Sequence, residues 1–312
     1  MLDTQAKSLL QLMVDRKVPA VNTLPPEQAR EFYVVRKSLT QPDPPSMSFT
    51  RDHLPTLGGI QVPVREYRPA GVQPTDTLPA LVYFHGGGWV IGDIETHDTL
   101  CRQLADGSSA VVFSVNYSKS PENRFPVAVD ECTAATRYVI DQSDSLGIDA
   151  SRIGVGGDSA GGNLATVVAL TLRGQLNKPL VCQLLIYPVT DLRLSKDSIE
   201  RYAVGYGLTT AAMRYFRDAY LRDSSDQDDF RASPLLASDL SKLPPALVLT
   251  AGFDPLRDEG RAYADALSAA GNQVQYVCFE RQIHGFIIMG GIIDEANTAV
   301  AMCVDYVRTC FK

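Results

Sequence analysis

The stretch RIGVGGDSAGGNLATVVALTLR, residues 152–173, decides the fold of this 312-residue chain. Its first residues are predicted to form a strand that leads directly into GDSAGG, and the remainder is predicted to form a helix. So tight a turn from strand to helix drives Ser159 to a positive φ, where bulky neighbours would clash. Gly157 and Gly161 relieve that crowding. The turn therefore lifts the hydroxyl of Ser159 above the C-terminal edge of a sheet, at the N-terminus of the next helix.

Short β-rich runs and helix-length segments alternate along most of the chain. Two β-rich runs, SFTRDH and IQVPVREYRP, come first. The later runs are ALVYF (80–84), AVVFSV (110–115), RIGV (152–155), LVCQLLIYP (180–188), ALVLTAG (246–252) and VQYVCFE (274–280). Helices are predicted between and after them at residues 127–142, 163–173, 259–270 and 294–308. This alternation indicates an α/β protein whose mainly parallel sheet is covered on both faces by helices.

Two segments do not follow this alternation. Residues 1–46 contain two helical patterns and end in QPDPPS, which breaks the chain. Residues 191–236 are far longer than one connection between neighbouring strands requires. We interpret them as an inserted helical segment that packs with the N-terminal helices.

Composition excludes several classes of partner. A formal net charge of -7 argues against nucleic acid or an anionic membrane surface. No apolar run reaches the roughly 18 residues that cross a bilayer, so membrane insertion is not expected. The N-terminus lacks the pattern of a secretory signal, and the six scattered cysteines fit reduced thiols. These features predict a cytoplasmic protein.

Ser159 needs a base, because a hydroxyl alone is a poor nucleophile near neutral pH. A G-x-S-x-G string alone is weak evidence, since composition produces one by chance in roughly one chain in eight of this length. The chain has four histidines, and His284 follows the strand VQYVCFE, which places it at the same sheet edge as Ser159. His85, His97 and His53 lie in less favourable positions.

An acidic residue must orient the imidazole and stabilise its charged form. Asp254 follows the strand ALVLTAG and lies at the same edge of the sheet. Asp258, four residues further on, is the alternative, although an acidic residue in the first turn of a helix also has a purely structural explanation. We favour Asp254 because it is nearer to the end of the strand.

HGGGW, residues 85–89, is the second signal and directly follows the strand ALVYF. Consecutive glycines leave backbone N–H groups unshielded. Such donors can stabilise the anionic oxygen that forms when a carbonyl is attacked. A phosphate-binding loop is the alternative, but neither a Lys-Ser/Thr pair nor G-x-G-x-x-G spacing is present.

The order of the motifs resembles the hormone-sensitive-lipase-like carboxylesterases, which are α/β-hydrolases. The matching stretches are HGGGW (85–89), NYSKSPENRFPVAVDE (116–131), GDSAGGN (157–163), DPLRDEG (254–260) and HGF (284–286). The resemblance implies an α/β-hydrolase fold with a mainly parallel eight-stranded sheet and a helical cap. The cap would comprise residues 1–46 and 191–236, and the catalytic core residues 47–190 and 237–312.

The same resemblance assigns roles to individual residues. It implies that Ser159 is the nucleophile, His284 the base and Asp254 the acid. The implied oxyanion hole consists of the N–H groups of Gly87, Gly88 and Ala160, with Gly86 shaping the turn. Candidate pocket residues are Trp89, Tyr187, Leu208, Phe286 and Ile287. No metal or organic cofactor is implied.

The sequence departs from the family pattern at Ser118-Lys119-Ser120, where many relatives have Arg-Leu-Ala. This departure is similar to the acetyl-esterase branch. Glu122, which follows in the same segment, is expected to have a structural role.

The expected activity is hydrolysis of short-chain acyl esters through an acyl-enzyme intermediate. An amidase or peptidase on the same scaffold is the alternative within enzymes. A small-ligand receptor is the alternative outside enzymes, but plant gibberellin receptors, which resemble this family, lack the catalytic histidine that His284 provides here. By analogy with relatives, a homodimer is expected through the edge of the last strand.

Overall fold

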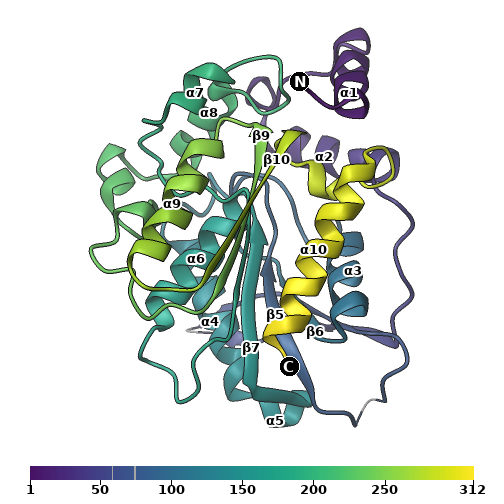
Figure 1. Ribbon diagram of the computed structural model, residues 1–312, viewed down its shortest axis with the longest axis vertical. Coiled ribbons are helices and arrows are strands. Elements are labelled where there is room, and N and C mark those ends of the chain that lie inside the picture. Colours follow the sequence, from purple (N-terminus) through teal and green to yellow (C-terminus); the bar gives the residue numbers. More distant parts are fainter. Residues whose placement is uncertain (58, 74) are drawn as a thin grey trace.

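The computed structural model describes residues 1–57, 59–73 and 75–312, and among these an eight-stranded sheet forms the centre of the molecule (Figure 1). Its strands lie in the order β1-β4-β6-β5-β7-β8-β9-β10. Their bounds are β1 (Phe49–His53), β4 (Val64–Arg68), β5 (Leu78–Phe84), β6 (Val111–Val115), β7 (Ile148–Asp158), β8 (Gln183–Ile186), β9 (Ala246–Phe253) and β10 (Val274–Ile283). The short strands β2 (Thr56–Leu57) and β3 (Ile60–Gln61) form a separate two-stranded sheet.

The direction of the strands confirms the predicted α/β class. β1 and β4 are antiparallel to their neighbours, whereas β6, β5, β7, β8, β9 and β10 are parallel to one another. The carboxyl ends of these six strands therefore meet at one edge of the sheet. This edge is where the loops after the strands can bring distant residues together.

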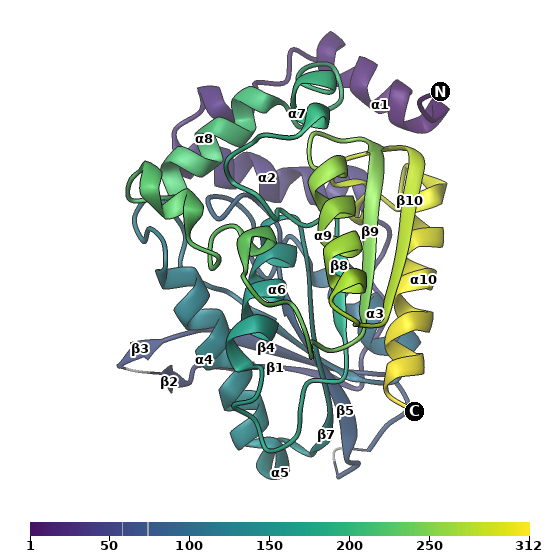
Figure 2. The ribbon, with the colours of Figure 1, turned by 60° about the vertical axis from the view of Figure 1, so that its left-hand side comes forward.

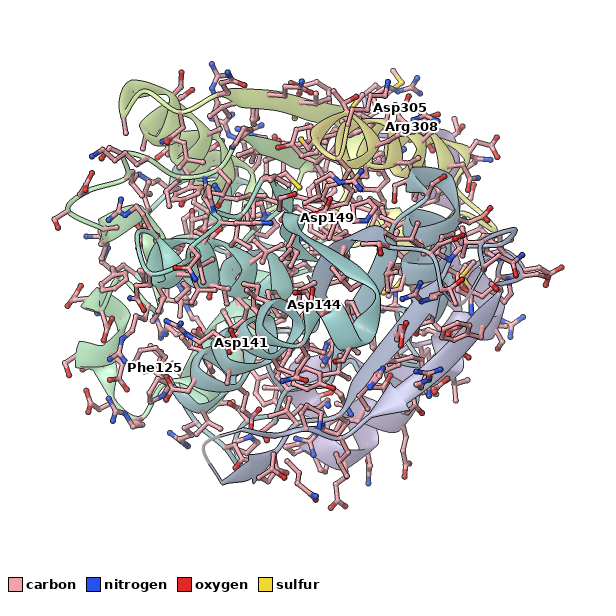
Figure 3. The ribbon with its side chains drawn as sticks, turned by 90° about the horizontal axis from the view of Figure 1, so that it is seen from below. Phe125, Asp141, Asp144, Asp149, Asp305 and Arg308 are labelled. Carbon is pink, nitrogen blue, oxygen red and sulfur yellow. The ribbon has the colours of Figure 1, made fainter. Side chains whose placement is uncertain are left out.

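Helices cover both faces of the sheet, as the alternating pattern predicted. One face carries α4 (Val127–Asp141), α6 (Ala160–Leu172) and α9 (Arg257–Ala269), and the other carries α3 (Asp98–Ser108) and α10 (Asp294–Cys310) (Figures 1 and 2). The short helix α5 (Ser143–Leu146) leads into β7 at the opposite, amino end of the strands. Asp141, Asp144 and Asp149 lie at this end (Figure 3).

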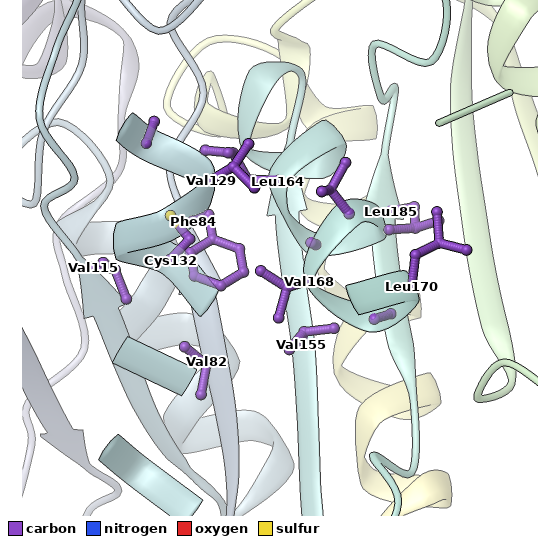
Figure 4. Close-up of a cluster of buried hydrophobic side chains, with 14 of the residues drawn as sticks. Val82, Phe84, Val115, Val129, Cys132, Val155, Leu164, Val168, Leu170 and Leu185 are labelled. Atoms are coloured by element: carbon purple, nitrogen blue, oxygen red, sulfur yellow. The ribbon is translucent and has the colours of Figure 1, made fainter. Parts of the chain in front are cut away.

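The apolar core under α4 and α6 holds these helices against the sheet (Figure 4). Val82, Phe84 and Val155 contribute from the strands and meet side chains such as Val129 and Leu164 from the helices. All five are at most 2% exposed. Burying one such side chain stabilises the fold by about 1.5–3 kcal/mol, so this layer holds α4 and α6 firmly on the sheet.

The two segments outside the alternation lie above the carboxyl edge of the sheet (Figure 2). Their helices are α1 (Thr4–Asp15), η1 (Val21–Thr23), α2 (Pro26–Thr40), α7 (Asp197–Arg201), α8 (Thr210–Tyr220), η2 (Ser224–Asp228) and η3 (Pro234–Leu236). Ala29 of α2 packs with Ala212 and Phe216 of α8 in one apolar cluster, which also contains Val90 and Ile91. The N-terminal helices and the inserted segment therefore pack together, as predicted.

Across the described ranges, no helix combines the length and the apolar character that a membrane span requires.

Candidate active site

Ser159 occupies a sharp turn between β7 and α6. Its φ of 57° and ψ of -118° confirm the positive φ predicted for this position. A Cβ atom on Gly157 would overlap the carbonyl oxygen of Gly161, and one on Gly161 would overlap that of Phe84. Glycine is therefore required on both sides of the serine, because the backbone leaves no room for a side chain.

His284 and Asp254 reach Ser159 from neighbouring strands. His284 directly follows β10, and its Nε2 lies 2.9 Å from the Oγ of Ser159. Its Nδ1 lies 2.7 Å from Oδ2 of Asp254, which directly follows β9. Asp254 is fully buried, and its Oδ1 accepts a hydrogen bond from the N–H of Leu256 at 2.9 Å. The carboxylate is thus held in one orientation, with one oxygen directed at the imidazole.

Asp258, the alternative acid, points elsewhere. Its Oδ2 accepts a hydrogen bond from the N–H of Ser198 at 3.0 Å, and its Oδ1 forms an ion pair with Arg257 at 2.7 Å. The structure therefore brings Asp254, and not Asp258, to His284.

The other histidines are engaged away from the serine. The His85 ring stacks on Tyr117 with centroids 4.2 Å apart, and burial lowers its pKa well below the ordinary value. His53 pairs with Glu66 at 2.8 Å. His97 lies beside Asp158, the residue before Ser159, and does not contact Ser159 itself.

The glycine loop, residues 85–89, presents two backbone N–H groups beside the serine. Gly87 and Gly88 have φ values of 121° and 58°, which favour glycine, and both border the same cavity as Ser159. Among the described residues, the N–H groups of Gly87, Gly88 and Ala160 have no hydrogen-bond acceptor. They are therefore available to an anionic oxygen. The N–H of Gly86 is not available, because it donates to Asp158 Oδ1 at 3.0 Å.

Asp158 links the glycine loop to the turn that holds Ser159. Its Oδ1 also accepts a hydrogen bond from the hydroxyl of Tyr83 at 2.9 Å, and its Oδ2 lies 3.3 Å from Nε2 of the buried His97. Burial opposes the ionisation of Asp158, but the charge of His97 and these hydrogen bonds hold its pKa below the ordinary value. The roles of Asp158 and His97 were not predicted from the sequence, and no local pattern marks them as partners.

A cavity of about 660 Å³ lies above Ser159. Of the predicted pocket residues, Trp89 and Leu208 border it. Tyr187, Phe286 and Ile287 do not, which corrects that part of the prediction.

The three residues that do not border the cavity belong to the apolar core instead. Tyr187 packs against the His284 ring with centroids 4.5 Å apart and is buried. Phe286 and Ile287 begin the short helix η4 (Phe286–Ile288), which turns their side chains into the apolar cluster under α10. Gly285 and Met289 border the cavity instead.

Much of the cavity wall comes from the N-terminal helices, which were predicted as part of the cap but whose individual wall residues were not predicted from the sequence. α1 contributes Leu10 and Met13, and α2 contributes Phe32, Tyr33 and Arg36. The amphipathic patterns of these helices indicate buried faces but do not distinguish a face against the core from one against a cavity.

The segment around residues 118–122 supports the site from outside the cavity. Glu131 accepts hydrogen bonds from the N–H and hydroxyl of Ser118, and Lys119 donates to Asn116. Glu122 pairs with Arg30 of α2 at 2.7 Å, which fits the structural role expected for it. Within the described part of the chain, no three His, Cys, Asp or Glu side chains are grouped to hold a metal ion.

The parallel sheet, the serine at the strand-to-helix turn and the histidine and aspartate at the same edge define an α/β hydrolase. Residues 81–288 match a family model described as the alpha/beta hydrolase fold. The ethyl acetate hydrolase of Pseudomonas putida is 43% identical over 254 residues, which cover 81% of this chain and 80% of that protein. The carboxylesterase NlhH of Mycobacterium tuberculosis is 40% identical over 245 residues, which cover 78% of this chain and 76% of that protein.

Solved structures agree over the whole length of the chain. A thermostable esterase from Pseudomonas putida has a TM-score of 0.96 at 35% identity, covering 100% of this chain and 98% of that one. An ester hydrolase from the metagenome of Lake Arreo, complexed with a bipyridine phosphonate derivative, has a TM-score of 0.95 at 41% identity, covering 100% and 99%. The chain belongs to the hormone-sensitive-lipase-like carboxylesterases of the α/β-hydrolase superfamily, as its motifs predicted.

Proposed function

We propose that this carboxylic ester hydrolase acts through Ser159 as nucleophile, His284 as general base and Asp254 as the acid that orients the imidazole. One observation carries the proposal. The Oγ of Ser159 lies 2.9 Å from Nε2 of His284, whose other ring nitrogen lies 2.7 Å from the buried carboxylate of Asp254. These distances are within the range in which a base can take a proton from a nucleophile.

The first half of the reaction forms an acyl-enzyme. His284 Nε2 takes the hydroxyl proton while Ser159 Oγ attacks the ester carbonyl carbon. The carbonyl oxygen becomes an anion and accepts hydrogen bonds from the N–H groups of Gly87, Gly88 and Ala160. One such donor typically lowers the barrier by about 2.7–4 kcal/mol. His284 then gives its proton to the leaving alkoxide, and the alcohol departs.

The second half restores the enzyme. Water takes the place of the alcohol, and His284 removes one of its protons while the oxygen attacks the acyl carbon. The tetrahedral intermediate uses the same N–H donors. Its collapse breaks the bond to Ser159 Oγ, which recovers the proton from His284, and the carboxylic acid is released.

We propose short-chain acyl esters as substrates. The cavity of about 660 Å³ has a mainly apolar lining, to which Trp89 and Leu208 contribute. Residues 1–46 and 191–236 both contribute to its wall, which supports their role as a cap over the remaining core. The relative from Pseudomonas putida is named for the hydrolysis of ethyl acetate, a small ester.

We also propose a homodimer formed through β10, which is the edge strand of the sheet and offers one unpaired side to a second copy. A cytoplasmic location and the absence of nucleic-acid partners remain predictions. The free state of all six cysteines and the net charge of -7 are consistent with them.

The direct test compares Ser159→Ala with Ser145→Ala, because Ser145 is exposed on α5 far from the site. Cleavage of p-nitrophenyl butyrate should fall on the order of 10⁶-fold in kcat for Ser159→Ala and stay at the parent level for Ser145→Ala. Retention of near-parent activity by Ser159→Ala would show that another residue is the nucleophile.

Two further measurements separate the alternatives. A matched pair of an ester and an amide with the same acyl group distinguishes an esterase from an amidase or peptidase, and we expect the ester to be cleaved far faster. Covalent labelling by a fluorophosphonate distinguishes a serine hydrolase from a receptor that only binds a ligand.

A further inference from the structure

The cavity above Ser159 carries a charge opposite in sign to that of the whole protein. Its wall includes three cationic side chains, Lys7, Lys17 and Arg36, and one carboxylate, Asp158. That carboxylate is buried and accepts hydrogen bonds from the hydroxyl of Tyr83 and the N–H of Gly86. The protein as a whole has a net charge of -7.

The excess negative charge of the protein lies partly at the opposite end of the molecule. Asp141 and Asp144 are exposed at the amino end of the strands, together with the half-buried Asp149 (Figure 3). The three cations that border the cavity attract an anionic substrate toward it.

Arg36 is the only one of these three cations whose side chain is half-buried rather than exposed. Its guanidinium lies 5.6 Å from the centroid of the Tyr33 ring, which also borders the cavity. Stacking on an aromatic face holds a guanidinium in place while its N–H donors stay free at the edges. Among the described residues, none accepts a hydrogen bond from the Arg36 side chain or forms an ion pair with it within 4 Å.

The other cations of α2 have protein partners. Arg30, less than two turns earlier, binds Glu122 and two backbone carbonyl oxygens. Lys37, next in the chain, lies 3.8 Å from a carboxylate oxygen of Asp98. Arg36 differs from both because it borders the cavity and is left without an acceptor.

A half-buried guanidinium without an acceptor is suited to a ligand that brings one. A carboxylate matches it best, because its two oxygens can accept two parallel N–H bonds. The hydroxyl of Tyr33 also has no hydrogen-bond partner among the described residues and adds a donor on the same wall.

We propose that this enzyme selects esters that carry a carboxylate away from the scissile bond, and that Arg36 binds this carboxylate. Lys7 and Lys17, which are exposed and also border the cavity, add attraction for the same charge. The inference rests on the proposed function, because Ser159 must attack the ester while Arg36 holds the remote group. The carboxylate can belong to the acyl part or to the alcohol part of the ester.

Two pairs of substrates test the proposal. Monoethyl glutarate is compared with ethyl 5-oxohexanoate, in which a methyl ketone replaces the carboxylate on the acyl side. Similarly, 4-acetoxybutanoate is compared with 5-acetoxypentan-2-one for the alcohol side. Released acid is titrated near neutral pH, and each rate is divided by the alkaline hydrolysis rate of the same ester to remove differences in intrinsic reactivity.

The variants are Arg36→Gln and, as a matched control, Arg51→Gln. Arg51 also lies over an aromatic ring, 5.0 Å from the centroid of Phe49, but it is exposed on β1 and does not border the cavity. In the parent, kcat/KM should favour the anionic ester of at least one pair by about tenfold. Arg36→Gln should abolish this preference mainly through KM, and Arg51→Gln should preserve it.

Neutral esters separate this inference from the proposed function. Parent and Arg51→Gln should cleave them at similar rates, Arg36→Gln should lose less activity on them than on the anionic esters, and Ser159→Ala should cleave neither kind. Equal or lower kcat/KM for the anionic ester in both pairs would overturn the inference, as would a preference that survives Arg36→Gln. A parent that cleaves none of the four esters would contradict the proposed function and the inference together.

Discussion

The carboxylate of Asp158 accepts a hydrogen bond of 3.0 Å from the backbone N–H of Gly86 and so joins the two loops of the site. Asp158 directly precedes Ser159 in the chain. Gly86 directly precedes the glycines whose N–H groups face the cavity. One buried carboxylate thus holds the turn of Ser159 at a fixed distance from the amides proposed to stabilise the anionic oxygen.

Replacing Asp158 by asparagine should lower kcat with little change in KM. The amide can keep its one oxygen toward Tyr83 and Gly86, but it then places an NH2 group against Nε2 of His97, where Oδ2 lies in the parent, and it loses the negative charge. An unsatisfied buried donor costs about 1–3 kcal/mol, and if that cost falls on the transition state kcat drops roughly 10–100-fold. We would measure kcat and KM on p-nitrophenyl butyrate, with thermal unfolding to verify that the variant is folded.

Asp141→Asn is the control, because Asp141 is exposed at the far end of the sheet. It should leave kcat unchanged. A folded Asp158→Asn variant with the kcat of the parent would show that the carboxylate does not position the glycine loop.

Gly88→Ala should reduce activity through contact with helix α8. Gly88 has a φ of 58°, and a Cβ atom there would overlap the ring of Phe216. Gly174 has a similar φ of 70° but no neighbour within 4 Å of its Cβ position. Gly88→Ala should therefore lose at least about tenfold in kcat, while Gly174→Ala should carry only the modest cost of a left-handed alanine.

A second substitution identifies the contact responsible. Phe216→Ala introduced into Gly88→Ala removes the ring and should restore part of the lost kcat. An unchanged kcat in the double variant would mean that backbone strain, and not the ring, causes the loss.

Arg30→Met should destabilise the protein more than Glu122→Gln. Arg30 donates to the carbonyl oxygens of Val90 at 2.8 Å and Ser120 at 3.0 Å, in addition to its pair with Glu122. Loss of the carbonyl partners should lower the free energy of unfolding by about 1–3 kcal/mol. The side chain of Glu122 is 51% exposed, so its removal should cost less than about 1 kcal/mol. Urea denaturation measures both values, and equal losses would contradict the prediction.

The stability of the fold should depend on pH through Glu259. Burial raises its pKa to about 8 from an ordinary 4.5, although the N–H groups of Thr190 and Asp191 donate to one oxygen and favour the charged form. A pKa that is higher in the folded than in the unfolded chain gives a stabilising contribution that is fully present below about pH 4.5. That contribution is lost as pH rises toward 8.

Glu259→Gln removes this dependence because the amide stays neutral. The free energy of unfolding of the variant, relative to the parent, should therefore rise between pH 5 and 8 by a few kcal/mol. Urea denaturation at a series of pH values provides the measurement, with the exposed Glu31→Gln as control. Parallel curves for the parent and Glu259→Gln would show that Glu259 does not titrate in this range.

The position of Ser159 and the approach of His284 could be predicted because each follows from local rules. A strand that runs into a helix through glycines forces the serine out of the backbone. Residues that follow neighbouring parallel strands meet at one edge of the sheet. The choice of Asp254 over Asp258 rested on the same rule, since Asp254 is the first residue after β9.

The supporting contacts could not be predicted because they depend on tertiary geometry. His97 and Asp158 are 61 residues apart and meet only once the sheet has formed. An apolar residue after a strand can face either the core or a cavity, which is why Phe286 was assigned to the wrong one. A charged residue on an amphipathic helix can likewise face solvent or a cavity, so no pattern in the sequence indicates that Arg36 borders the site.

Covalent labelling with a fluorophosphonate, followed by peptide mass spectrometry, tests the central claim most directly. We predict one adduct per chain on the peptide that contains Ser159, with parallel loss of ester cleavage, and greatly slowed labelling in His284→Ala. An adduct on any other residue, or ester cleavage that continues after Ser159 is fully modified, would contradict the mechanism.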